Sequence, residues 1–223
     1  MDYIFQFGAI LDSLPRLLAG AKLTVMLTVA TMLGGVVIGI LGAIGRMFGP
    51  PPIRAALTVY VETIRNTPFL IQLFLIYFGL PSLGIVLSPT WAALIGMTVN
   101  CGAYAIEIIR SGIVSIPPGH LEAGRALAFR TRDIIRHIVL FPAMRVALPA
   151  LGSQFVLVML GSSVVSTIAT EELTAVGHLL ETETFRPFEV YIVVTILYVA
   201  IAFAMKAMFA GIGHFYFNRR GGL

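Results

Sequence analysis

The residue types that carry enzyme chemistry are few in this 223-residue chain and lie far apart in it. The only cysteine is Cys101, and the four histidines are His120, His137, His178 and His214. The sequence has no Walker A phosphate loop, no paired histidine or cysteine ligands for a metal, and no spacing that would support a Ser-His-Asp triad. We therefore expect no catalytic residue and no metal site, and a protein that is not an enzyme.

A charged segment, Glu122–Arg145, interrupts an otherwise apolar chain and indicates binding rather than catalysis. It holds five arginines, one glutamate and one aspartate. The Pro-Pro-Gly run at 117–119 should end the preceding helix, after which residues 120–127 can form a short helix with the glutamate in its first turn, where the dipole favours it. A second amphipathic helix is expected from Thr131 to Leu140. Two such helices suit docking on a cytoplasmic protein; a solvated or headgroup-bound loop is the alternative.

The composition excludes an ordinary water-soluble domain. Hydrophobic residues make up 58% of the chain, charged residues 12%, and the mean hydropathy is +0.94, whereas soluble domains contain roughly 25% charged residues. So little charge cannot cover a surface that faces water, and the solvent must be a lipid bilayer. The net charge of +4 is then explained by membrane topology, and we expect no nucleic-acid partner. At this length we expect one transmembrane domain, residues 1–223.

Five segments are apolar enough to span a bilayer, which takes about 20 residues of helix. We expect them at Leu23–Ile44, from Ala55 or Thr67 to Leu80, at Trp91–Ile109, at Val146–Ala169 and at Val190–Phe217. The second is the least regular, because Glu62 and Arg65 interrupt its start and Pro68 should kink it. No ten-residue alternating pattern predicts barrel strands, so the expected fold class is all-α transmembrane with about five membrane-spanning helices.

The arginines are distributed unevenly over the connections between these spans. They follow the first span, lie between the third and fourth, and follow the fifth at Arg219 and Arg220, whereas the connection 171–189 holds five glutamates against one Arg186. By the positive-inside rule the N-terminus lies outside and the C-terminus in the cytoplasm, together with the Glu122–Arg145 segment. The N-terminus lacks a basic region before a short apolar core, so we expect an uncleaved anchor.

Polar and small residues within the spans are candidates for a substrate path. Asn100, Tyr104 and Glu107 are spaced four and three residues apart, and such a polar stripe normally faces a bundle interior or a watery cavity. We expect Glu107 itself to pair with Arg110 or Arg65. The candidate substrate path consists of Gln72, Asn100, Tyr104, Gly161, Ser162 and Ser163. Hydrogen bonding that merely holds the helices together is the alternative.

Two other patterns predict packing and solvation. Gly35, Gly39 and Gly42 share one face of the first span, where the absence of side chains lets another helix approach closely. The lone cysteine lies in an apolar stretch and is expected to be buried. Glu171 and Glu172 lie beside a membrane edge, where we expect both to be solvated.

The charged segment resembles the EAA loop of binding-protein-dependent ABC importer permeases, whose pattern is Glu-Ala-Ala, three residues, Gly, nine residues, Ile-x-Leu-Pro. The matching positions here are Glu122, Ala123, Gly124, Ala128, Ile138, Leu140 and Pro142. The second alanine of the pattern is glycine in this chain, the loop glycine is alanine, and the proline comes one residue late. The resemblance places a cytoplasmic coupling loop at about residues 117–145.

Blocks elsewhere resemble the polar amino acid subgroup of the same permeases. They are Tyr60–Pro68, Gln72–Pro81, Ala103–Arg110, Ile113–Pro117, Glu172-Leu173 and Thr184-Phe185. Together they extend from roughly residue 20 to residue 220 and are more specific than the loop alone. The resemblance implies a multi-pass protein of the bacterial inner membrane with the type I ABC importer permease fold.

The resemblance also implies partners. Two permease subunits, of the same or similar chains, would form the pore; two cytoplasmic ATPase subunits would dock on the loops; and a periplasmic solute-binding protein would deliver substrate. This chain would bind no cofactor, since ATP and Mg would be held by the partner ATPase. ATPase closure would reach the permease as a rigid-body motion. The residues implied in ATPase coupling are Glu122, Ala123, Gly124, Arg125, Ala126 and Ala128.

One departure from the subgroup bears on the substrate. Many members carry Lys-Asp-Thr-Ser in the fourth span, where this chain has Leu160-Gly161-Ser162-Ser163. Losing the charged pair gains space, which fits a polar amino acid or an amino-acid-like compound, including a bulkier opine-like one. The substrate could also be held in a partner permease or only in the binding protein. The alternatives from other classes are an ion-coupled secondary transporter, which needs carboxylates at mid-membrane, and a membrane scaffold with no transport path.

Overall fold

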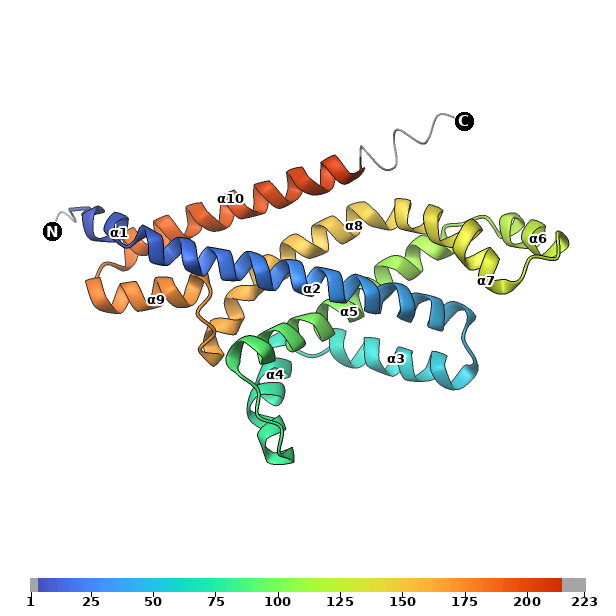
Figure 1. Ribbon diagram of the computed structural model, residues 1–223, viewed down its shortest axis with the longest axis horizontal. Coiled ribbons are helices and arrows are strands. Elements are labelled where there is room, and N and C mark those ends of the chain that lie inside the picture. The colour runs from blue at the N-terminus through green and yellow to red at the C-terminus, as the bar shows by residue number, and fades with distance from the viewer. Residues whose placement is uncertain (1–3, 214–223) are drawn as a thin grey trace. The chain divides into compact units, whose positions relative to one another are not determined.

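The computed structural model describes residues 4–213, which are helical almost throughout and include no strand (Figure 1). The described residues form two compact units. Unit 1 contains residues 4–31, 69–97 and 156–205, and unit 2 contains residues 32–68, 98–155 and 206–213.

Four helical stretches among the described residues are long and apolar enough to cross a bilayer. They are α2 (Leu14–Phe48), α5 (Pro89–Val114), the stretch Thr131–Ile168 and α10 (Pro187–Gly213). They lie where the sequence predicts the first, third, fourth and fifth spans, which confirms the all-helical transmembrane class. The predicted end of the fifth span at Phe217 lies outside the described residues, as do His214, Arg219 and Arg220.

The second predicted span is broken rather than merely kinked. It consists of α3 (Pro51–Arg65), α4 (Phe69–Phe74), a π-helix η1 (Leu75–Gly79) and a 3-10 helix η2 (Leu80–Leu83), with the break at residues 66–68. Pro68 has no N–H to donate and disfavours helical backbone in the residue before it. Asn66 adds to the stop, because its side-chain amide donates to the Glu62 carbonyl at 2.8 Å.

α2 is longer than the sequence pattern predicts, at 35 residues against the expected Leu23–Ile44. It follows the short helix α1 (Gly8–Asp12) almost directly. Arg16 lies within the extra turns, where its guanidinium is paired with Glu183 at 2.7 Å on an exposed surface. The extra turns are also held by burial, since Leu17 is fully buried in a cluster with Leu180 and Val190 of unit 1.

The helix after the charged segment also departs from expectation. A separate short helix from Thr131 to Leu140 was the prediction, and it is wrong. α7 (Thr131–Asp133) and the π-helix η3 (Ile134–Val139) continue into α8 (Leu140–Gly161) and a 3-10 helix η4 (Ser162–Ile168). Pro142 cannot form its backbone bond to the preceding turn, but the wider π-turns just before it accommodate that loss without ending the helix.

The glycine face of α2 packs closely in unit 2, as predicted. A Cβ added to Gly35 would stand 2.6 Å from the sulfur of Cys101, and one added to Gly39 would stand 2.6 Å from the Cβ of Ala105. Cys101 is fully buried by this contact. Close approach of α2 to α5 therefore depends on missing side chains, which is how membrane helices gain packing contacts in lipid.

α6 (Pro118–Ala126) and α9 (Leu173–Thr184) are both too short to span a bilayer. α6 follows α5, and α9 precedes α10 (Figure 1). α9 is bounded by Ala169 and Phe185, both in the left-handed region with φ of 60° and 56°. These reversals separate α9 from the long helices on either side of it.

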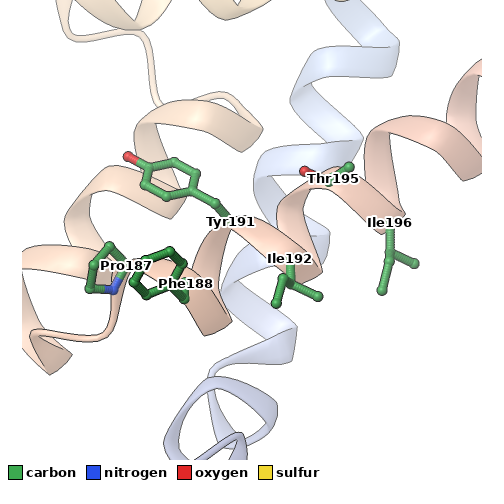
Figure 2. Close-up of a pocket in the computed structure, with 6 residues that line it drawn as sticks. All are labelled: Pro187, Phe188, Tyr191, Ile192, Thr195 and Ile196. Carbon is green, nitrogen blue, oxygen red and sulfur yellow. The ribbon is translucent and has the colours of Figure 1, made fainter. Parts of the chain in front are cut away.

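One face of α10 stays open, as Figure 2 shows. A hollow of about 480 Å³ is lined by this helix alone, at Pro187, Phe188, Tyr191, Ile192, Thr195 and Ile196. Phe188, Ile192 and Ile196 recur every four residues and point to the same side of the ribbon. An apolar strip of this kind, without a second wall, is the surface that a helix presents to lipid.

Candidate functional site

The nine residues of α6 present the predicted coupling positions on the surface of unit 2. Pro118 occupies the first helical turn, where its missing N–H costs nothing. No side chain caps the helix start. The exposed residues among the predicted set are Glu122, Ala123, Arg125, Ala126 and Ala128.

Gly124 is the one predicted coupling residue that is buried. A Cβ at this position would stand 2.7 Å from Cδ1 of Ile138 and 3.2 Å from Cγ1 of Ile134. These isoleucines belong to η3, so the bare backbone of Gly124 is what lets α6 lie against the start of the long helix. The departure from alanine in the family pattern therefore coincides with a close contact.

The end of α6 gives a reason for the glycine in the EAA pattern. The N–H of Ala128 donates to the Arg125 carbonyl at 2.9 Å, and the N–H of Phe129 donates to the Gly124 carbonyl at 3.1 Å. These are the two bonds of a Schellman motif. Its pivot, Ala128, has φ of +56°, a conformation that glycine adopts without strain and alanine does not.

Cations and apolar side chains surround α6. Arg130, Arg132 and Arg136 are exposed, and Leu127 and Phe129 are 69% and 48% exposed. We call α6 together with the exposed residues up to Arg136 the coupling surface. It combines exposed apolar area with positive charge, and its role in docking stays a prediction.

Glu107 in α5 is committed to ion pairs. Its carboxylate accepts from Arg110 at 2.8 Å and from Arg46 at the end of α2. Pairing with Arg110 confirms the sequence prediction, whereas Arg65 instead lies over the ring of Tyr104, 5.3 Å from its centroid. The Arg46 partner was missed, because nothing in the sequence aligns the end of α2 with this turn of α5.

The Gly-Ser-Ser segment changes the helix type in unit 1. The α-helical stretch ends at Gly161 and a 3-10 helix begins at Ser162. Ser162 is buried and donates to the Met159 carbonyl at 2.7 Å, and Ser163 donates to the Leu160 carbonyl at 2.9 Å. Each hydroxyl thus donates to the carbonyl three residues before it. Gly161 has open space where a Cβ would point.

The remaining candidate path residues divide between the units. Gln72 is 8% exposed in α4, which packs against η4 within unit 1. Asn100 and Tyr104 are half-buried in the part of α5 that belongs to unit 2. α4 and η4 are thus brought together, and a single path through all six residues stays a prediction.

A buried carboxylate corrects one sequence expectation. Glu171 is exposed as predicted, but Glu172 is fully buried. It caps α9 by accepting from the Ala175 N–H at 3.0 Å, and its other oxygen accepts from the Tyr198 hydroxyl at 2.7 Å and the Thr24 hydroxyl at 3.3 Å. Tyr198 and Thr24 lie far away in sequence, so the expectation of solvation rested on neighbours alone.

A second carboxylate that sequence reasoning overlooked is Glu189 in the first turn of α10. It is fully buried and accepts from the Gln6 backbone N–H at 2.9 Å and from Arg186 at 3.0 Å. Arg186 also donates to the Ile4 carbonyl at 3.4 Å. The only sequence signal was the i,i+3 spacing of Arg186 and Glu189, which did not indicate that the pair holds the N-terminal segment.

The outer surface of α9 carries exposed ionisable groups. A hydrogen bond from Tyr191 lowers the pKa of Glu181, helped by His178 at 3.2 Å. A hydrogen bond from Arg16 lowers the pKa of Glu183 in the same way. Both carboxylates therefore stay charged at neutral pH. Within residues 4–213, no three His, Cys, Asp or Glu side chains gather as metal ligands would.

Taken together, the long apolar helices, the break after α3 and the exposed coupling surface define a membrane transport subunit. Residues 35–214 match the family described as binding-protein-dependent transport system inner membrane component, and the chain belongs to this family. Family membership decides against the ion-coupled transporter and the scaffold.

Characterised relatives align over nearly the full chain. The glutamine transport system permease protein GlnP of Escherichia coli (strain K12) is 35% identical over 204 residues, which is 91% of this chain and 93% of that one. The nopaline transport system permease protein NocM of Agrobacterium fabrum (strain C58 / ATCC 33970) is 35% identical over 209 residues, with 89% and 87% covered.

Solved structures agree with the fold. An amino acid ABC transporter crystallised with histidines has a TM-score of 0.85 at 31% identity, over 95% of this chain and 99% of that one. The MetNI methionine ABC transporter, facing inward, has a TM-score of 0.79 at 19% identity, over 91% and 97%, and this match concerns the fold alone. The chain is a multi-pass inner-membrane permease subunit of an ABC importer, as the sequence predicts.

Proposed function

We propose that this permease imports an amino acid or an amino-acid derivative, and that separate ATPase subunits drive it through the coupling surface. The observation that carries the coupling role is the exposure of Glu122, Arg125 and Ala126 on a helix that Gly124 holds against η3. ATP and Mg belong to the ATPase partner, and a second permease chain completes the pore. A solute-binding protein delivers the substrate, in keeping with the family description.

The coupling role is tested by charge reversal on α6. In proteoliposomes that contain the complete transporter, Glu122→Lys should leave membrane insertion intact while uptake falls at least tenfold, because the ATPase no longer docks in register. The matched control is Glu171→Lys, which reverses an exposed glutamate next to α9 and should leave coupling unchanged. Normal uptake by Glu122→Lys would remove α6 from the coupling role.

The substrate class is supported by the relatives and by local space. The relatives named above belong to glutamine and nopaline transport systems. Gly161, in the last turn of α8 just before η4, has open space where a Cβ would point. We propose that a compound with an amino-acid backbone is accepted and that a bulky conjugate also fits. Unlabelled glutamine should compete with the uptake of radiolabelled glutamine. The degree to which nopaline also competes would decide whether the transporter tolerates a bulky substrate.

The path residues are tested separately from the substrate. Replacing Ser162 and Ser163 with leucine should block uptake or change the pattern of competition if η4 lines the path. Leucine at Thr167, an exposed residue of the same 3-10 helix, is the control for helix disruption. Unchanged uptake kinetics in the double variant would assign both serines to packing alone.

The orientation follows from the charges. We propose that the coupling surface faces the cytoplasm and α9 the outside, because the arginines gather near α6 and the glutamates near α9. In right-side-out vesicles of a Cys101→Ala background, an impermeant maleimide should label Glu183→Cys and not Ala126→Cys. Labelling of Ala126→Cys alone would invert the topology.

A further inference from the structure

A groove in unit 2 lies between α8 and the last turns of α10. It measures about 540 Å³ and is bounded by Leu148, Pro149 and Ser153 on one side and by Lys206, Phe209 and Ala210 on the other. The bottom of the groove is closely packed, because Gly152 faces Phe209 and the rings of Phe155 and Phe209 lie 5.4 Å apart. A volume of this size falls within the range of about 300–1,000 Å³ that small-molecule sites occupy.

Among the described residues that line this groove, Lys206 is the one with a charged side chain. The side chain is exposed, and Pro187, the first residue of α10, lies ~28 Å away along the helix at 1.5 Å per residue. That length nearly equals the hydrocarbon thickness of a bilayer, about 30 Å. With Pro187 at one edge of the hydrocarbon region, the ammonium group of Lys206 comes within reach of the lipid phosphates at the other.

The neighbouring surface adds charge of the same sign. Arg145 is exposed and lies four residues before Pro149, which places it on the groove-lining face of α8 toward the helix start. Ser153 has its hydroxyl turned to the Pro149 carbonyl at 3.2 Å, so the middle of the groove offers apolar walls. The groove thus joins an apolar channel to a positive mouth.

We propose that this groove binds one phospholipid with a negatively charged headgroup, whose phosphate pairs with Lys206 while an acyl chain fills the space between α8 and α10. A small soluble anion would make no use of the apolar walls, whereas a phospholipid uses both the apolar walls and the cation. Electrostatic attraction of a lysine to an anionic leaflet changes affinity about fivefold per charge.

The proposal is tested on the full-length chain purified in detergent, by native mass spectrometry during titration with dioleoyl-phosphatidylglycerol or dioleoyl-phosphatidylcholine. The wild-type chain should retain phosphatidylglycerol at about fivefold lower lipid concentration than phosphatidylcholine. Lys206→Gln should abolish that preference, and Lys206→Arg should keep it. Ala210→Phe fills the groove and should weaken binding of both lipids.

The controls use the same substitutions outside the groove. Lys22 is the only other lysine in the chain, and Lys22→Gln should keep the preference. Ala207→Phe adds the same bulk at an exposed position of α10 that does not line the groove and should bind lipid as the wild type does. Equal retention of phosphatidylglycerol by Lys206→Gln and wild type would overturn the proposal. So would a change in oligomeric state by Ala210→Phe with lipid binding unchanged, since that outcome assigns the groove to a second copy.

Discussion

The two short helices, α6 and α9, are anchored in opposite ways. α9 starts on a fully buried carboxylate, Glu172, whose oxygens accept from its own backbone and from Thr24 and Tyr198. α6 starts on a proline, has no side-chain cap, and exposes its glutamate. The polar groups at the start of α9 are satisfied within the chain, whereas α6 has no side-chain cap and an exposed glutamate.

The two helices therefore differ in what their carboxylates can do: one stabilises the fold, and the other is accessible for binding. A carboxylate buried with several donors fixes a helix in place and is costly to disturb. An exposed carboxylate adds little to stability and stays available for binding. α9 is therefore a rigid part of unit 1, and α6 is the element suited to receive a force from outside.

The largest effect is expected at Glu172. Glu172→Leu should lower the free energy of unfolding by about 3 kcal/mol, because it removes the acceptor of the Ala175 N–H, the Thr24 hydroxyl and the Tyr198 hydroxyl in a buried site. In detergent the melting temperature should fall by several degrees relative to the wild type. The control is Glu171→Leu at the exposed neighbour, which should melt within 1–2 °C of the wild type, about the effect of an ordinary surface change. Equal melting of the two variants would contradict the buried cap.

The next largest effect is expected at Gly124, where α6 contacts η3. Gly124→Ala adds a Cβ 2.7 Å from Ile138 and should cost about 1–3 kcal/mol by overpacking. A displaced α6 should also weaken the coupling of ATP hydrolysis to transport, so ATP-driven uptake should fall. Gly119 lies in the same helix with nothing within 4 Å of its added Cβ, and Gly119→Ala should be neutral or slightly stabilising. Identical uptake by the two variants would show that α6 does not need its contact with η3.

At Ala128, the residue with positive φ at the end of α6, we expect a smaller effect of opposite sign, namely a gain in stability. Ala128→Gly removes the strain of a positive φ and should stabilise the end of the helix by about 1 kcal/mol. Hydrogen exchange should slow at the Phe129 amide, which donates into the Schellman motif. Ala126→Gly, inside the helix, should speed exchange there by a similar free energy. Faster exchange in Ala128→Gly would contradict the left-handed end.

The smallest effect is the surface ion pair beside α9. The pKa of Glu183 is lowered by Arg16, so its contribution to stability is present above the ordinary glutamate pKa of about 4.3 and is lost as the pH falls through the lower folded value. At pH 7 the wild type should melt slightly above Glu183→Gln, and the gap should close below about pH 4. A gap that widens in acid would reverse the sign of this linkage.

Patterns along the chain were sufficient for four of the five predicted spans and for the existence of α6. Apolar length predicts α2, α5, α8 and α10, since a bilayer admits few other structures, and the spacing of Gly35, Gly39 and Gly42 predicts their close packing. These signals are local, because each depends on residues within a few turns of one helix.

What the sequence missed depends on contacts between distant residues. The burial of Glu172 is set by Thr24 and Tyr198, and the Arg46 partner of Glu107 comes from another helix. The continuation of η3 into α8 was missed because a proline reads as a helix stop unless the wider turn before it is known. The coupling and path assignments rest on resemblance and geometry, and their roles stay predictions.

Site-specific photo-crosslinking tests the central contrast between the two helices most directly. A photoreactive amino acid at Ala126 of α6, in membranes that contain the whole transporter, should form a covalent adduct with the ATPase subunit. The same residue at His178, which is exposed on α9, should not. An ATPase adduct at position 178, or none at position 126 in assembled transporter, would contradict the account.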